Sequence, residues 1–182
     1  RRHWNASEHE AEIRDGAPVD VFVSASDAEM DKAQSMKLID PATRRVIALN
    51  ALVLIVPADA TTALRSFSGL AQAHVKRIAI GQPNIVPAGE YAAEVLKTLK
   101  LQDALENKLI YGSSVRQVLD YVERGEVDAG IVYATDAIAA GAKVRLVATA
   151  KQSWHDPIRY VAAAVSASKQ SDAARGFIAD LL

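Results

Sequence analysis

The sequence has no cysteine, which excludes disulfide bonds and thiol chemistry. It has no excess of basic residues either, because 21 lysines and arginines face 22 acidic residues and leave a formal net charge of −1. Since no basic cluster is present, this balance argues against a nucleic-acid partner. The longest apolar run, ALVLIVP, is far too short to cross a bilayer as a helix. We therefore expect neither a nucleic-acid complex nor insertion into a membrane.

What remains is an ordinary globular composition, 50% hydrophobic and 24% charged, over 182 residues. That length suits one large domain or two small lobes. The chain begins at Arg1 without a methionine or an apolar signal region, so we expect a processed or truncated product. Residues 1–15 are polar, and their histidines and glutamates do not follow the HExxH order of a zinc site. We therefore expect no metal ligands there.

The most informative stretch is residues 112–137, which predicts a loop, a helix, a turn and a strand. Ser114 and Gln117 form a capping box, in which each side chain satisfies a backbone N–H at the helix start. Gly125 stands where a left-handed helix cap prefers glycine. The strand-like sequence KLIYG precedes the helix, and the buried-strand pattern AGIVY follows it. The apolar stripe of the helix consists of Val115, Val118, Leu119 and Val122.

A second strand, loop and helix lie earlier in the chain. RIAIG (77–81) is strand-like, QPNIV (82–86) is a loop, and Pro87 stands at a first helical position, where its missing N–H is not needed. Parallel strands that feed helix N-termini at one sheet edge place ligands at the carboxyl ends of the strands. The helix stripe consists of Ala88, Tyr91, Ala92, Val95, Leu96 and Leu99.

Both loops suit an anion. A helix N-terminus offers free N–H groups and a partial positive charge. Neither loop contains lysine or arginine, and no GxxxxGK[ST] motif marks a nucleotide site. Neutral donors of this kind suit a dehydrated oxyanion. The alternative is that both loops do no more than cap their helices.

The chain ends are expected to pack together. VDVFVSA (19–25) and RYVAAAVSAS (159–168) are strand-like, and a terminal helix follows, with Ala174, Phe177, Ile178, Leu181 and Leu182 on one face. Two long β-rich stretches, VIALNALVLIVP (46–57) and KVRLVATA (143–150), could cross between lobes. We predict a first lobe of residues 1–51 and 148–182 and a second lobe of residues 52–147.

The stretch VERGEVDAGIVYATDA resembles the signature of periplasmic molybdate-binding proteins of ABC transporters. The resemblance implies a type II periplasmic-binding-protein-like α/β fold, with two lobes, a hinge and mainly parallel sheets flanked by helices. It also implies closure over a tetrahedral oxyanion without catalysis. The first lobe would be incomplete, because this chain lacks the family's N-terminal segment. Four other stretches resemble the family in the same order, at residues 16–26, 38–57, 77–96 and 143–150.

The resemblance also implies ligand-binding residues. Ala88 and Val115 would donate backbone N–H groups, and Tyr133 its phenolic O–H. Ser7 lies one place from the position of a family serine. The alternative is that Ala88 and Val115 are ordinary first-turn residues and Tyr133 a core residue at a strand end. The ligand would be molybdate or tungstate, with no cofactor and no protein ligands to a bare metal ion.

The implied setting is the periplasm, with a membrane permease as partner and a monomeric binding protein. Since the first lobe lacks a loop, we expect these 182 residues to bind the oxyanion weakly or not at all. Three alternatives stay open: a sulfate-type oxyanion binder, an effector-binding domain of a regulator, and a hydrolytic enzyme. The four histidines, at 3, 9, 74 and 155, are scattered without a triad-like context, so we predict that the protein is not an enzyme.

Overall fold

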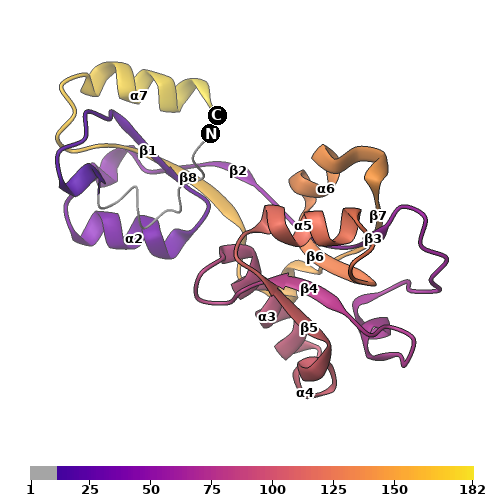
Figure 1. Cartoon of the computed structure of the whole chain (residues 1–182). Helices are drawn as coiled ribbons and strands as arrows, with labels where there is room; N and C mark the ends of the chain where they lie inside the picture. The colour runs from indigo at the N-terminus through magenta and orange to yellow at the C-terminus, as the bar shows by residue number, and fades with distance from the viewer. Residues whose placement is uncertain (1–11) are drawn as a thin grey trace. The chain divides into compact units, whose positions relative to one another are not determined.

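A computed structural model describes residues 12–182, which form two units, each with its own β-sheet (Figure 1). Within the described residues, unit 1 consists of residues 12–49 together with Ile158–Leu182, and unit 2 is the continuous stretch Asn50–Pro157. No helix within residues 12–182 is long and apolar enough to cross a membrane. The protein is therefore an α/β molecule in which one unit is built from both ends of the chain.

Unit 1 has a three-stranded sheet in the order β1-β8-β2, formed by β1 (Val21–Ser24), β8 (Arg159–Ala164) and β2 (Arg45–Leu49). Helices α2 (Asp27–Ser35) and α7 (Ser171–Asp180) cover its two faces (Figure 1). Alternate residues of β8 face opposite sides, as strand geometry requires. Val161 and Ala163 pack in the same cluster as Met30 of α2, whereas Ala162 and Ala164 pack with α7.

Unit 2 has a five-stranded sheet in the order β5-β4-β6-β3-β7. Its helices lie on both faces, with α5 against a core of valine, isoleucine and alanine side chains and α3 on the opposite side (Figure 1). The strands are β3 (Leu52–Pro57), β4 (Ile78–Gly81), β5 (Leu109–Gly112), β6 (Ala129–Tyr133) and β7 (Val144–Thr149). The main helices are α3 (Pro87–Thr98), α5 (Val115–Glu123) and α6 (Ala134–Ala140). The shorter elements of both units are η1 (Pro41–Thr43), η2 (Phe67–Ala71), α4 (Gln102–Leu105), η3 (Glu106–Lys108), η4 (Gly141–Lys143) and η5 (Gln152–Trp154).

The unit 1 sheet is antiparallel and the unit 2 sheet is mixed, so the expectation of mainly parallel sheets is wrong. In unit 1, β8 runs antiparallel to both of its neighbours. In unit 2, β4 is parallel to β5 and β6, but β3 is antiparallel to β6 and β7. In unit 2 the strand antiparallel to its neighbours is β3, through which the chain enters the unit. In unit 1 it is β8, through which the chain returns from unit 2. Such a strand has no helical crossover from a neighbour to make it parallel.

The stretch VIALNALVLIVP forms two strands that belong to different sheets. β2 ends at Leu49, β3 begins at Leu52, and Asn50 and Ala51 lie between them. All six residues of β3 are buried, whereas most of β2 is exposed. The chain therefore passes from the unit 1 sheet to the unit 2 sheet at Asn50 and Ala51, within one continuous apolar stretch.

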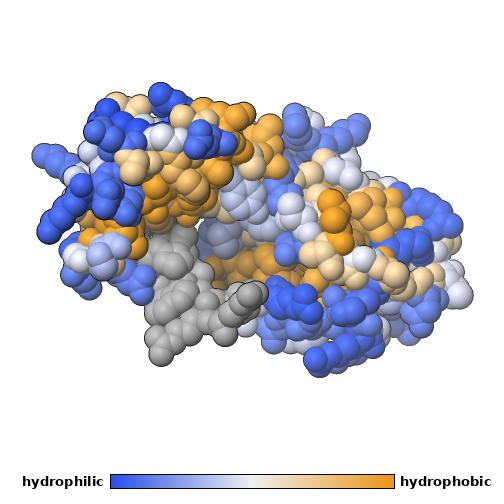
Figure 2. All heavy atoms as spheres, turned by 90° about the horizontal axis from the view of Figure 1, so that it is seen from above, coloured by the Kyte–Doolittle hydropathy of each residue, from blue (hydrophilic) through white to orange (hydrophobic). Residues whose placement is uncertain are grey.

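Unit 1 exposes several large apolar side chains on its edge strands and on α7. Val23 and Val46 of the two edge strands are 45% and 44% exposed, and Leu49 is 67% exposed. On α7 only Ala174 and Ile178 are buried, because the helix packs through a narrow stripe onto the small alanines of β8. Phe177, Leu181 and Leu182, expected on the same inward face, are exposed. Figure 2 shows this apolar surface on the side of α7.

Candidate functional site

One edge of the unit 2 sheet gathers three of the predicted ligand-binding residues. β4 and β5 are parallel and end in register at Gly81 and Gly112. β6 is parallel to β4 and ends at Tyr133. Since the carboxyl ends of parallel strands share an edge, the starts of α3 and α5 lie at the same edge as Tyr133.

The start of α5 has a capping arrangement that differs from the expected one by a residue. Ser114 has the extended conformation of an N-cap, with φ −158° and ψ 160°, and its Oγ accepts the N–H of Gln117 at 3.2 Å. This half of the predicted capping box is confirmed. The other half is wrong, because Gln117 Oε1 accepts from the N–H of Ser113 at 2.6 Å and from its Oγ at 2.9 Å. Val115, partly buried, is the first helical residue, so its N–H has no acceptor within the helix.

The start of α3 follows an uncharged loop that is held by backbone hydrogen bonds. Gln82 donates its N–H to Gly112 O at 2.9 Å, which joins this loop to the end of β5. Pro87 is the first helical residue, as predicted. Glycine is required at position 89, because a Cβ there would lie 2.1 Å from Gly81 O. Ala88 has no exposed surface, so α5 offers the more accessible of the two helix starts.

Tyr133 ends β6 and is the N-cap residue of α6, where it is 8% exposed. It pairs with Leu52 of β3, and the next residue, Ala134, donates its N–H to Ala51 O at 2.8 Å. The Asn50 side chain donates to Thr135 Oγ1 at 3.0 Å. The residues that link β2 to β3 therefore fix the backbone on which Tyr133 lies. Sequence reasoning missed Asn50, although it is the one polar residue within a long apolar run.

Asp136 lies in the first turn of α6, three residues after Tyr133. Burial raises the pKa of its carboxyl above the ordinary value of 3.8. A hydrogen bond from the Tyr133 backbone and the positive charge of Arg116 lower the same pKa, with a smaller effect. An acidic group with an unfavourable ionised form therefore lies beside the sheet edge that carries the predicted site.

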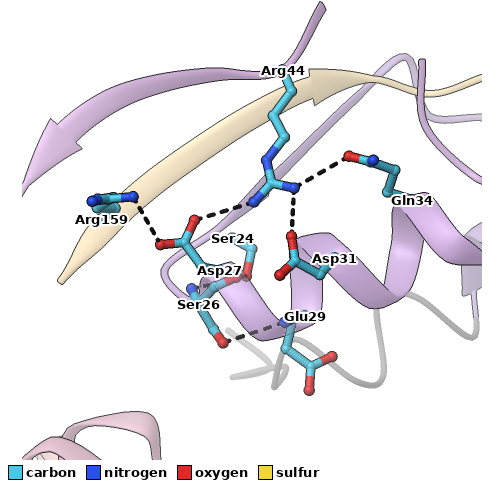
Figure 3. A network of polar contacts seen from close by, with 8 residues as sticks. All are labelled: Ser24, Ser26, Asp27, Glu29, Asp31, Gln34, Arg44 and Arg159. Atoms are coloured by element: carbon cyan, nitrogen blue, oxygen red, sulfur yellow. Dashed lines mark hydrogen bonds and ion pairs between the residues drawn. The ribbon is translucent and has the colours of Figure 1, made fainter. Parts of the chain in front are cut away.

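Helix α2 in unit 1 also follows a strand and a short loop, but its N-terminus is already satisfied (Figure 3). Ser26 Oγ accepts the N–H of Glu29 at 3.4 Å. The Asp27 carboxylate in the first turn forms ion pairs with Arg44 at 3.2 Å and Arg159 at 3.6 Å (Figure 3). An internal carboxylate thus lies at this helix start, whereas the first turn of α5 contains no acidic residue.

Ser7, the fourth predicted ligand-binding residue, lies outside the described residues. Within residues 12–182 no three histidine, aspartate or glutamate side chains are grouped as a metal site. The described part of the predicted site therefore consists of Ala88, Val115 and Tyr133, presented by three neighbouring strand ends.

Known proteins share this architecture and much of the sequence. Residues 3–182 match the family described as "Bacterial extracellular solute-binding protein". The substrate-binding lipoprotein YvgL of Bacillus subtilis, assigned to an ABC transporter, is 40% identical over 91% of this chain and 63% of its own. The molybdate-binding protein ModA of Escherichia coli is 39% identical over 85% of this chain and 61% of its own.

A solved structure agrees closely with the fold. It is the substrate-binding domain assigned to a molybdenum ABC transporter of Clostridium difficile, with a TM-score of 0.86 and 36% identity over 100% of this chain and 78% of its own. The chain spans a little over three fifths of the length of YvgL and ModA. By sequence and by fold, the chain belongs to the family of bacterial extracellular solute-binding proteins, which serve in transport and not in catalysis.

Proposed function

We propose that this protein binds a tetrahedral oxyanion, molybdate, as the substrate-binding component of an ABC transporter. The observation that carries the proposal is the edge of the unit 2 sheet where two helix N-termini and a tyrosine meet without a cationic side chain in either loop. Relatives with molybdate in their names support the choice of anion. In this proposal the two units are the two lobes of the binding protein.

Neutral donors suit this anion because a fully ionised oxyanion has acceptors only. Each hydrogen bond to a charged group contributes about 1.5–3 kcal/mol, and a helix N-terminus adds ~0.3–1 kcal/mol. Val115 would donate its backbone N–H and Tyr133 its phenolic O–H. Ala88 has no exposed surface, so the loop at residues 82–86 would have to shift slightly before its N–H could reach the anion. Ser7 would add a hydroxyl.

The biological setting follows from the family. A solute-binding protein of this kind works outside the cytoplasm, and we propose the periplasm and a membrane permease as partner. Tungstate has the same charge and oxygen geometry, so we propose that it competes with molybdate. No cofactor takes part in the proposed binding.

An NMR titration of the 182-residue chain tests the proposal, because it detects weak binding residue by residue. Molybdate, tungstate, sulfate and phosphate are added separately into the millimolar range, with sodium chloride at equal ionic strength as control. We expect saturable shifts of the Ser114 and Val115 amides with molybdate and tungstate. Stronger shifts with sulfate would favour the sulfate-type alternative. Of the two outcomes expected from the sequence, weak binding or none, the proposal requires weak binding, so the absence of saturable shifts with every anion would refute it.

A further inference from the structure

Gln117 holds the loop between β5 and α5 in an unusual way. In a capping box the side chain three residues after the N-cap accepts the N–H of the N-cap residue. Here Gln117 Oε1 accepts both the N–H and the Oγ–H of Ser113, one residue earlier. The Gln117 N–H is in turn accepted by Ser114 Oγ. One glutamine therefore ties down both residues of the loop.

The other end of the loop is fixed as well. Gly112 accepts the N–H of Gln82 at 2.9 Å, and a Cβ at position 112 would lie 2.9 Å from a methyl group of Val118. The donors of Ser113 are used by Gln117 and the N–H of Gln117 is accepted by Ser114 Oγ, so the capping contacts leave the backbone N–H groups of Ser114, Val115 and Arg116. These three consecutive N–H groups stand at the start of α5, where the helix dipole favours a negative ligand.

The residue at position 117 also sets the local charge. Glutamate serves equally well in a capping box, and the helix dipole favours an acidic residue in the first turn. A glutamate at position 117 would bond to Ser113 in the same way, but it would bring a negative charge into the network that supports the anion. The positive charge of the neighbouring Arg116 is balanced by Asp120, because Arg116 Nε lies 3.1 Å from Asp120 Oδ1 along the helix.

We propose that Gln117 is a positioning residue of the oxyanion site and keeps the capping network at the start of α5 uncharged. Its amide oxygen holds Ser113 so that the N–H groups of Ser114 and Val115 face the ligand. Because the side chain is uncharged, a dianion approaches without repulsion from the capping network. This inference rests on the proposed function, since it concerns the same site.

The test compares the wild-type chain with Gln117→Glu, which keeps the acceptor and adds a charge, and with Gln117→Met, which keeps the length and removes the acceptor. The first measurement is hydrogen exchange of the Ser113 amide without any anion. We expect it to remain protected in Gln117→Glu and to exchange several-fold faster in Gln117→Met. The amide shifts of α5 report whether the helix remains formed in each variant.

The second measurement is a molybdate titration of the three proteins at low and at high salt, followed by the Val115 amide. Gln117→Glu should bind about tenfold more weakly or worse at low salt and recover part of the loss at high salt, because the added charge is screened. Gln117→Met should bind several-fold more weakly at both salt concentrations. A purely structural role would not produce this contrast in salt dependence.

The outcomes separate the two hypotheses. If the wild-type chain shows no saturable amide shifts with molybdate, both the proposed function and this inference are refuted. A wild-type chain that binds molybdate, together with a Gln117→Glu variant of equal affinity at low salt, would overturn the inference alone. Unchanged exchange of the Ser113 amide in Gln117→Met would show that Gln117 does not hold the loop.

Discussion

Replacing Val115 by proline should delete one ligand-binding N–H while leaving α5 in place. The preceding residue, Ser114, is already extended, which is the conformation that proline requires of its neighbour. Proline suits a first helical position because its φ matches the helix and no intrahelical hydrogen bond uses that N–H. The molecule contains the same arrangement at α3, where Pro87 follows Val86 with φ −113° and ψ 114°.

The expected loss can be worked out from the single donor removed. A hydrogen bond to a charged group contributes about 1.5–3 kcal/mol, which corresponds to roughly 10- to 150-fold in the dissociation constant. Val115 also packs against the core beneath α5, so its side chain contributes to stability. Val115→Ala removes most of that packing and keeps the donor, which makes it the matched control.

The assay is the NMR titration with molybdate, followed through the amides of Ser114 and Gln117, which both variants retain. Thermal unfolding without anion shows whether both variants remain folded. Val115→Pro should bind roughly 10- to 150-fold more weakly than Val115→Ala. Equal dissociation constants in two folded variants would show that this N–H does not touch the anion, and the site would have to be placed elsewhere.

Three further predictions concern the neighbouring residues. Tyr133→Phe should weaken molybdate binding by about 1.5–3 kcal/mol in the same titration, and an unchanged affinity would return Tyr133 to a core role. Asp136→Asn should raise the melting temperature at neutral pH, because burial raises the pKa of this carboxyl and its ionised form costs folding free energy. In the wild type, the Asp136 carboxyl ionises at a lower pH in the unfolded state than in the folded state. The protonated carboxyl therefore contributes its full stability below pH 3.8, and this stability is lost as the pH rises through the folded pKa. Thermal melts of Asp136→Asn across acidic pH should lack this dependence of stability on pH. Asn50→Ala should lower the free energy of unfolding by about 1 kcal/mol through the lost bond to Thr135 Oγ1, and a double-mutant cycle with Thr135→Val in urea denaturation should show their coupling.

The sequence predicted the local elements of the site well, because their signals are local. The N-cap at Ser114 and the first helical Pro87 are both observed, and Gly125 has the expected positive φ of 66°. The parallel pairing of β4 with β5 followed from two strand-loop-helix units in succession. The placement of Ala88, Val115 and Tyr133 at one sheet edge could be expected on this basis.

The strand directions could not be predicted in the same way. A strand that is buried on both faces, such as β3, reads as a continuous apolar run whether its neighbours are parallel or antiparallel. The Gln117 contact was missed for a different reason. The Ser-x-x-Gln spacing identifies the two residues of a capping box but not which N–H the glutamine oxygen meets, since a side-chain rotation decides between Ser113 and Ser114.

The central position of β8 in unit 1 has a consequence for how the chain folds. Among residues 12–182, β1 and β2 pair only with β8 within their sheet, so neither of these strands has a partner there until β8 is available. Unit 2 is continuous and can form its sheet first, whereas unit 1 must close a loop that contains all of unit 2. In pulsed hydrogen exchange during refolding, amides of β6 should gain protection before those of β8. The unit 1 sheet therefore forms only after β8 pairs with β1 and β2, and unit 1 completes folding last.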